Sequence, residues 1–308
     1  DVRLSRLPVG SSASNNCGSL IIERAIATLR EGDEYFNRVA GADANIRLTG
    51  KDTITAQFLG SQTQYPSYVA EDNDQLSETF DGTALKLHYS HSERSFEACA
   101  GYDDTSDGFR ADLGFMPQVG YKEAHTSGRY IWCPKSGWFS RLWIGPTLRA
   151  SRDQRGDHLR DRVDMTMFME GGLQSQLQPR VAREKVSYNG TEFDLTWVSF
   201  WGQMKPTSDL VVGLSFVAGD HIDYANTRPG ERLHVLPSMR YFVGRRLQFA
   251  LAHTFERMVV DEGELYNANI TRLTAIYQLT PRTRFKAVID GVDYRYNVDL
   301  YNDDRDPR

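Results

Sequence analysis

Residues 247–256 read LQFALAHTFE, and this stretch decides the fold. Its large apolar residues alternate with small or polar ones: Leu247, Phe249, Leu251 and Phe255 against Gln248, Ala250, Ala252, Thr254 and Glu256. A period of two places the two sets on opposite faces of an extended strand. The stretch therefore predicts a β-strand with one apolar face and one polar face.

The same alternation recurs along the chain, for example in residues 53–58, 210–219 and 272–279. Helical periodicity is nearly absent. The segment Leu20–Arg30 could be taken for a helix, but it is short and interrupted by Glu23 and Arg24. We predict an all-β chain of about fifteen strands, with no helix longer than about three turns.

The connections between these strands differ in length. Clusters of Gly, Pro and Asp predict tight turns at Gly50–Asp52, Ser92–Arg94, Lys135–Gly137, Gln178–Arg180, Pro206–Asp209, Gly244–Arg246 and Pro281–Thr283. Longer polar stretches predict loops at Ser61–Gly82, Asp104–Phe115, Ser151–Arg160, Asp220–Arg232 and Val259–Asn267. Short turns on one rim and long loops on the other are typical of an antiparallel up-and-down transmembrane β-barrel, with the tight turns on the periplasmic side.

Composition is compatible with such a barrel. The chain has 308 residues, and 36 basic against 41 acidic side chains give a net charge of -5. The most apolar uncharged runs, Leu195–Met204 and Leu210–Gly219, are too short for a membrane helix of ~20 residues, but long enough for barrel strands of ~9–11. In this setting Leu247, Phe249, Leu251 and Phe255 are expected to face lipid, with Gln248 and Glu256 facing the lumen. The mild acidity disfavours a nucleic-acid partner.

Sites with recognisable chemistry are few. The chain has no GxSxG, P-loop, GxGxxG or HExxH motif, and we expect no cofactor. The weak catalytic candidates are Asp157 with His158 and Asp220 with His221, because an Asp–His pair on a rim can activate water. Asp103 and Asp107 are weak metal candidates, since residues 103–108 resemble the front of a calcium loop; its closing position, Gly114, has no carboxylate. A Cys99–Cys133 disulfide and two free thiols are both compatible with the sequence.

Residues 108–119 read GFRADLGFMPQV and resemble the signature FR-x-DLGF-x-PR of a bacterial outer-membrane barrel family. This family is catalogued as domain of unknown function 5916, and its members are described as carbohydrate-binding family 9-like proteins. Residues 35–43, YFNRVAGAD, are similar to its YNRVAG-x-D strand, and residues 269–281 resemble a third family segment. Gln118 stands where the family usually has Arg.

The resemblance implies the barrel portion of a longer protein. The family is described with a sugar-binding domain before the barrel and a last strand that ends in an aromatic residue, and neither is seen within residues 1–308. We therefore expect one β-barrel domain over 1–308. Within the motif Phe109, Arg110, Asp112, Leu113, Gly114 and Phe115 are expected to be structural, with an Arg110–Asp112 pair fixing the loop.

These observations lead to one main hypothesis and two alternatives. The main one is an outer-membrane barrel of a Gram-negative bacterium that acts as a transporter, channel or surface scaffold, linked to glycan binding or uptake. Its expected partners are outer-membrane lipid and lipopolysaccharide, a glycan or small solute, and a further protein. The alternatives are a surface hydrolase that uses the loop Asp and His residues, and a soluble β-rich binding protein, which the mean hydropathy of -0.51 allows.

Overall fold

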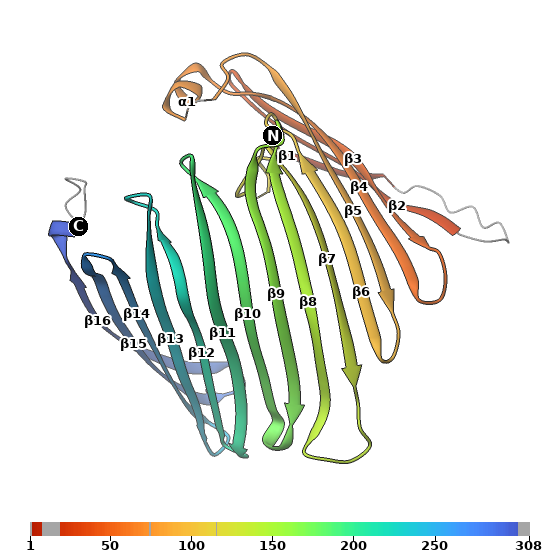
Figure 1. Ribbon diagram of the computed structural model, residues 1–308. Helices are drawn as coiled ribbons and strands as arrows, with labels where there is room; N and C mark the ends of the chain where they lie inside the picture. The colour runs from red at the N-terminus through yellow and green to blue at the C-terminus, as the bar shows by residue number, and fades with distance from the viewer. Residues whose placement is uncertain (1, 8–18, 74, 115, 301–308) are drawn as a thin grey trace. The chain divides into compact units, whose positions relative to one another are not determined.

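The computed structural model describes residues 2–7, 19–73, 75–114 and 116–300. These residues form sixteen strands in one sheet, each hydrogen-bonded to its neighbours in the chain (Figure 1). Every strand pair with a recorded register is antiparallel. The predicted all-β, up-and-down antiparallel fold is confirmed, with one strand more than the approximate count of fifteen.

The bounds of the strands are β1 (Val2–Leu7), β2 (Ser19–Gly32), β3 (Tyr35–Arg47), β4 (Asp52–Gln64), β5 (Phe80–Ser92), β6 (Phe96–Thr105), β7 (Tyr121–Trp132), β8 (Phe139–Asp153), β9 (His158–Gly171), β10 (Ser175–Tyr188), β11 (Thr191–Thr207), β12 (Leu210–Asp223), β13 (Arg228–Val243), β14 (Leu247–Val260), β15 (Gly263–Thr280) and β16 (Thr283–Tyr296). The segment Leu20–Arg30 lies in β2, so it is a strand and not a helix.

Helix is confined to short pieces. In the described part of the chain these are α1 (Ser67–Asp72), which lies between β4 and β5 (Figure 1), and the single 3₁₀ turns Gly172–Gln174 and Val298–Leu300. The prediction that no helix exceeds three turns is confirmed for these residues. Among them, no helix is both long and apolar enough to cross a membrane.

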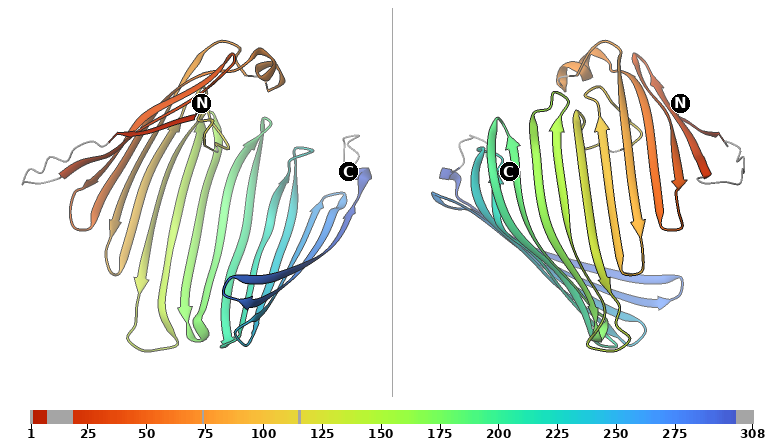
Figure 2. Two further views of the ribbon diagram at one scale, coloured as in Figure 1. Left: turned by 180° about the vertical axis from the view of Figure 1, so that it is seen from behind. Right: turned by 45° about the vertical axis from the view of Figure 1, so that its right-hand side comes forward.

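The sheet divides into two compact units, which are described separately. Unit 1 contains residues 1–129 and 147–161, and unit 2 contains residues 130–146 and 162–308. The single barrel domain expected over 1–308 stays a prediction. Figure 2 shows the same order of neighbouring strands from two further directions.

Most of the predicted tight turns are confirmed, and one is wrong. Residues 48–51, 93–95, 133–138, 208–209, 244–246 and 281–282 connect strands at the expected places. Gln178–Arg180, however, lies inside β10, and the turn before this strand is formed by Gly172–Gln174. Pro179 suggested a turn because it lacks an N–H, but it sits in the ladder opposite Phe200.

Two of the predicted long loops exist and three do not. Residues 65–79 and 106–120 connect β4 to β5 and β6 to β7. By contrast, most of Ser151–Arg160, Asp220–Arg232 and Val259–Asn267 continues as strand, and only residues 154–157, 224–227 and 261–262 are left as connections. Charged residues occur on both faces near these strand ends, between buried apolar residues such as Ile222, Val260 and Leu265, and this polarity accounts for the incorrect loop predictions.

Register defines two faces in unit 2. Residues directly opposite one another share a face, and one row of such partners runs across six strands: Met204, Val212, Met239, Leu251, Leu273 and Ile289. The next row across the sheet is shifted by one residue on every strand and consists of Gln203, Gly213, Ser238, Ala252, Arg272 and Asp290. The first row is entirely apolar, and the second contains only small or polar residues.

We call the face with the apolar row the outer face and the opposite face the inner face. Leu247, Phe249, Leu251 and Phe255 lie on the outer face, and Gln248 and Glu256 lie on the inner face, as predicted. Leu251 is 38% exposed and Ile289 is 66% exposed, so the row is not covered by other parts of the chain. An exposed apolar surface that continues over six strands is suited to contact with lipid.

On β14–β16 the outer face of unit 2 becomes polar before the strands end. Six residues beyond Leu251 along β14, the outer-face row is Val198, Ala218, Leu233, Arg257, Asn267 and Arg295, so it is apolar on β11–β13 and polar on β14–β16. β11 and β15 contain 17 and 18 residues, whereas a membrane-spanning strand needs only ~9–11. β14, β15 and β16 therefore extend beyond the apolar band at the end opposite the 244–246 turn.

Unit 1 shows the same two faces. Ile46, Ile54, Tyr89 and Ala100 form one row of opposite residues, and the adjacent row is Asn45, Thr55, His88 and Gly101. The first row belongs to the outer face of this unit and the second to its inner face. The inner face is the one on which the candidate site is built.

Candidate functional site

The connection from β6 to β7 folds back onto the inner face of β3, β4 and β5. Phe109 is 2% exposed and packs with Val39 and Ala84, and Leu59 borders this cluster. Burial of one aromatic side chain stabilises such a loop by roughly 1.5–3 kcal/mol. Phe109 thus attaches the motif segment to the sheet.

Two glycines allow the segment to approach the sheet backbone. A Cβ atom on Gly82 would lie 2.1 Å from the backbone nitrogen of Phe109, and one on Gly108 would lie 2.2 Å from the carbonyl oxygen of Asp81. No other residue fits at these distances without moving backbone. The two glycines come from sequence pieces 26 positions apart that meet only in the fold.

Buried polar side chains hold the backbone of the segment. Asn37 is 1% exposed; its Nδ2 donates to Thr63 Oγ1 at 2.9 Å and to the Arg110 carbonyl at 3.1 Å, and its Oδ1 accepts from the Asp112 amide at 3.1 Å. Ser61 Oγ accepts from the Arg110 amide at 3.0 Å. Each of these groups has a partner, so their burial does not carry the cost of an unpaired polar atom.

Asp112 is held by two tyrosines. Tyr35 Oη donates to one carboxylate oxygen at 2.6 Å, and Tyr65 Oη donates to the other at 3.0 Å. The two rings are stacked, with centroids 6.0 Å apart. Burial, together with the negative charge of Asp112 and the hydrogen bond to it, raises the pKa of Tyr65 to about 12.

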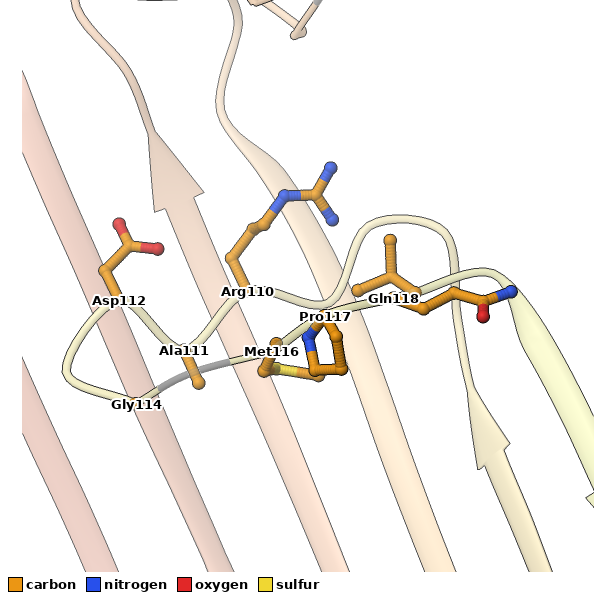
Figure 3. Close-up of a pocket in the computed structure, with 8 residues that line it drawn as sticks. Arg110, Ala111, Asp112, Gly114, Met116, Pro117 and Gln118 are labelled. Atoms are coloured by element: carbon orange, nitrogen blue, oxygen red, sulfur yellow. The ribbon is translucent and has the colours of Figure 1, made fainter. Parts of the chain in front are cut away.

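Arg110 points elsewhere. Its Nη2 donates to Gln75 Oε1 at 2.6 Å, its Nη1 donates to the carbonyls of Asp107 and Phe109, and its guanidinium lies over the Phe80 ring at 5.5 Å from the centroid. The expected Arg110–Asp112 pair is therefore wrong. The chain turns at Ala111–Gly114, and Figure 3 shows the two side chains leaving the segment in different directions.

The segment also borders a small pocket of about 330 Å³ (Figure 3). Arg110, Asp112, Met116, Pro117 and Gln118 contribute to its lining, so one cation, one anion and one amide surround it. Leu113 is 42% exposed, Gly114 closes the local turn through its amide, and Phe115 lies outside the described residues.

The catalytic candidates have local partners. In unit 1, the Asp157 amide donates to Asp153 Oδ1 at 2.8 Å, and His158 Nε2 lies 3.3 Å from Asp161 Oδ2. In unit 2, Asp220 accepts from the Thr196 amide at 2.7 Å, and the half-buried His221 packs its ring against Tyr224. Each contact explains the residue as part of a strand end or turn.

The two metal candidates, Asp103 and Asp107, do not belong to the same group of possible ligands. Asp103 lies with Glu123 and His125, and one donor atom of each falls within 4.8 Å of the others. Asp107 is not in this group, and its carbonyl accepts from Arg110. The spacing Glu-x-His within a strand places both side chains on one face, a signal that a search for helical metal motifs misses.

Cys99 and Cys133 are both free, and Cys99 Sγ lies 3.0 Å from Ser127 Oγ.

Comparison with solved structures identifies the class of fold. The copper transporter OprC is 13% identical, with 93% of this chain and 60% of that chain covered and a TM-score of 0.53. The ferric-catecholate import receptor Fiu of E. coli K12, in its open form, is 8% identical, with 96% and 63% covered and a TM-score of 0.54. A loop-deletion mutant of OmpT, an outer membrane protein of Vibrio cholerae, is 11% identical, with 91% and 95% covered and a TM-score of 0.45.

No protein-family model matches the chain, and no curated protein matches it. The likeness to solved structures concerns the fold, which is that of the outer-membrane β-barrels. This class was predicted from the strand and turn pattern, and the predicted outer-membrane location agrees with it. The chain spans 60% and 63% of the length of OprC and Fiu.

Proposed function

We propose that residues 1–308 form the membrane-spanning wall of a transport barrel in the outer membrane of a Gram-negative bacterium, and that segment 106–120 narrows its passage. The observation that supports this most strongly is the pair of adjacent rows in unit 2, one apolar over six strands and one polar. An apolar outer face fits lipid, and a polar inner face fits a water-filled interior.

Two places on the inner face of unit 2, each with groups of opposite charge side by side, favour a neutral polar solute. Arg272 pairs with Asp290, and His234 Nδ1 lies 2.7 Å from Glu256 Oε2. At these two places groups of opposite charge offer hydrogen bonds without a strong field, whereas Arg240, Arg284 and Lys286 add positive charge elsewhere on the same face. A neutral, hydroxyl-rich solute suits such a lining.

Aromatic residues on the same face support a glycan as the hydroxyl-rich solute. Trp197 and Trp201 of β11 lie four residues apart on the inner face, and Trp197 Nε1 donates to Glu184 Oε1 at 3.1 Å. Trp201 is 40% exposed. An indole face beside a carboxylate offers an apolar surface and a hydrogen-bond acceptor to a sugar ring. The sequence resemblance to the family of domain of unknown function 5916 adds to this proposal.

The polar end of the outer face supports lipopolysaccharide as a partner. Arg183 and Lys185 of β10, and Arg257 and Arg295 of β14 and β16, place cations on the outer face at the end of the strands opposite the 244–246 turn. Guanidinium and ammonium groups bind phosphate through charge-assisted hydrogen bonds. We assign this end to the outside of the cell.

The experiment is uptake of a neutral oligosaccharide into liposomes that contain the purified full-length protein. Asn37→Ala removes two of the hydrogen bonds that hold the segment, those to the Arg110 carbonyl and the Asp112 amide, and is expected to raise the rate of uptake. Asn269→Ala is the matched control, because the Asn269 amide donates to the nearby Asn267 side chain in unit 2. This variant is expected to leave the rate unchanged. If liposomes that contain either variant took up the oligosaccharide no faster than liposomes without protein, transport would be refuted.

A further inference from the structure

We propose that Asp103, Glu123 and His125 form a binding site for a divalent first-row transition metal on the inner face of unit 1. The proposal does not depend on transport, because it concerns residues within one unit of the sheet. Two carboxylate oxygens and one imidazole nitrogen converge within 4.8 Å. Bonds of roughly 2.0–2.2 Å to Zn²⁺ need only small side-chain movements from that arrangement.

The position of the imidazole is set by a glycine. A Cβ atom on Gly101 would lie 2.3 Å from Cε1 of His125 and 2.4 Å from its Nε2. The ring therefore lies directly over the backbone of β6, across from Asp103 two residues away on the same face. An alanine at position 101 could not coexist with the ring in this place.

The imidazole also has an unsatisfied nitrogen. Nδ1 of His125 is buried and has no hydrogen-bond partner among the described residues. A buried nitrogen without a partner destabilises the fold relative to one that is paired. A metal ion bound to either ring nitrogen fixes the tautomer and the ring orientation.

Charged side chains next to the three ligands orient them before a metal binds. Arg149 Nη1 donates to Glu123 Oε1 at 2.6 Å, which leaves the second carboxylate oxygen for a metal. Lys86 lies opposite Asp103 in the register, on the same face of the sheet. Hydrogen bonds to ligating carboxylates are a general feature of metal sites.

The donor set indicates the kind of ion. An imidazole nitrogen favours Zn²⁺, Co²⁺, Ni²⁺ or Cu²⁺ over the hard cations Ca²⁺ and Mg²⁺, which prefer oxygen alone. His88 provides a second imidazole nearby, with its ring centroid 6.0 Å from that of His125. The site therefore fits a borderline ion with three protein ligands and room for a further one.

The test is calorimetric titration of Zn²⁺ into the purified, chelator-treated protein in detergent. We expect one Zn²⁺ per chain, at least tenfold weaker binding in Asp103→Asn and His125→Ala, and a similar loss in Gly101→Ala, which keeps all three ligands. Glu97→Gln is the matched control: Glu97 lies on the same strand and face as Asp103, pairs with Arg129, and should change the affinity less than twofold.

A second measurement needs no variant. Zn²⁺ should protect His125 from diethyl pyrocarbonate in the wild-type protein and leave His91, which bonds to Asp52, equally reactive with and without the metal. Equal binding by the four variants, or equal protection of both histidines, would overturn the proposal.

Discussion

The outer face of unit 2 makes a quantitative prediction about charge. Leu251 has Met239 and Leu273 as its partners on the two neighbouring strands and is 38% exposed. If this face contacts lipid, an arginine at position 251 loses its hydration near the middle of the apolar band. The cost of such a change is about 2–4 kcal/mol, which corresponds to a roughly 30- to 1,000-fold smaller folding equilibrium constant.

The neighbouring residue is the matched control. Ala252 lies on the inner face between Ser238 and Arg272, and Arg272 is already paired with Asp290. An arginine at position 252 stays in water and meets one partly neutralised cation, so we expect a cost below about 1 kcal/mol.

The assay is urea-dependent folding into phospholipid vesicles, followed by the shift in gel mobility between folded and unfolded protein. Leu251→Arg should lower the free energy of unfolding by about 2–4 kcal/mol, and Ala252→Arg should change it little. Equal losses for the two variants would refute the assignment of faces.

Three further predictions follow from the site and the connections. An epitope tag in residues 224–227 should be reachable on intact cells and one in residues 244–246 should not; labelling of both would contradict the topology. Asn37→Ala leaves the Asp112 amide and the Arg110 carbonyl without their partner, so segment 106–120 should be cut by protease at least tenfold faster than in Asn269→Ala. The raised pKa of Tyr65 means that its bond to Asp112 stabilises the segment fully below the ordinary tyrosine pKa near 10 and is lost as the pH rises to about 12. Protease sensitivity of segment 106–120 should therefore increase between these values, and an identical increase in Tyr65→Phe would disprove that cause.

Much of the fold could be predicted from local patterns. The alternation in residues 247–256 is sufficient to assign both the strand and its two faces, because a period of two is a direct consequence of strand geometry. The turns at 208–209 and 244–246 could also be predicted, since Pro, Gly and Asp mark them. At the β10–β11 turn, Asn189 and Gly190 have φ of 47° and 76°, and an Asn-Gly pair is a known turn signal that the loop assignment overlooked.

The length of the strands could not be predicted in the same way. Alternation in polarity is interrupted where charged residues follow one another, as at Glu256 and Arg257, although the hydrogen-bonded ladder continues. The loops assigned to 151–160, 220–232 and 259–267 were errors of this kind. Backbone pairing holds these strand ends together with burial, since Ile222, Val260 and Leu265 are 1%, 4% and 2% exposed.

The candidate site depends on contacts between distant parts of the chain. Asp112 meets Tyr35, 77 positions earlier, and Arg110 meets Gln75, 35 positions earlier. Spacing suggested that Arg110 and Asp112 pair with each other, because two residues apart on an extended chain share a face. The chain is not extended here, because it turns at Ala111–Gly114, so the two side chains do not share a face.

The central claim is that one face of each strand contacts lipid over a limited band. The most direct measurement is a scan of β14 with single cysteines from position 247 to 258, in a background with Cys17, Cys99 and Cys133 replaced by serine, each carrying a fluorophore quenched by spin-labelled lipid in vesicles. Quenching should be strong at positions 247, 249 and 251, weak at 248, 250 and 252, and weak again at 257. Quenching without a period of two, or strong quenching at the even positions, would contradict the account.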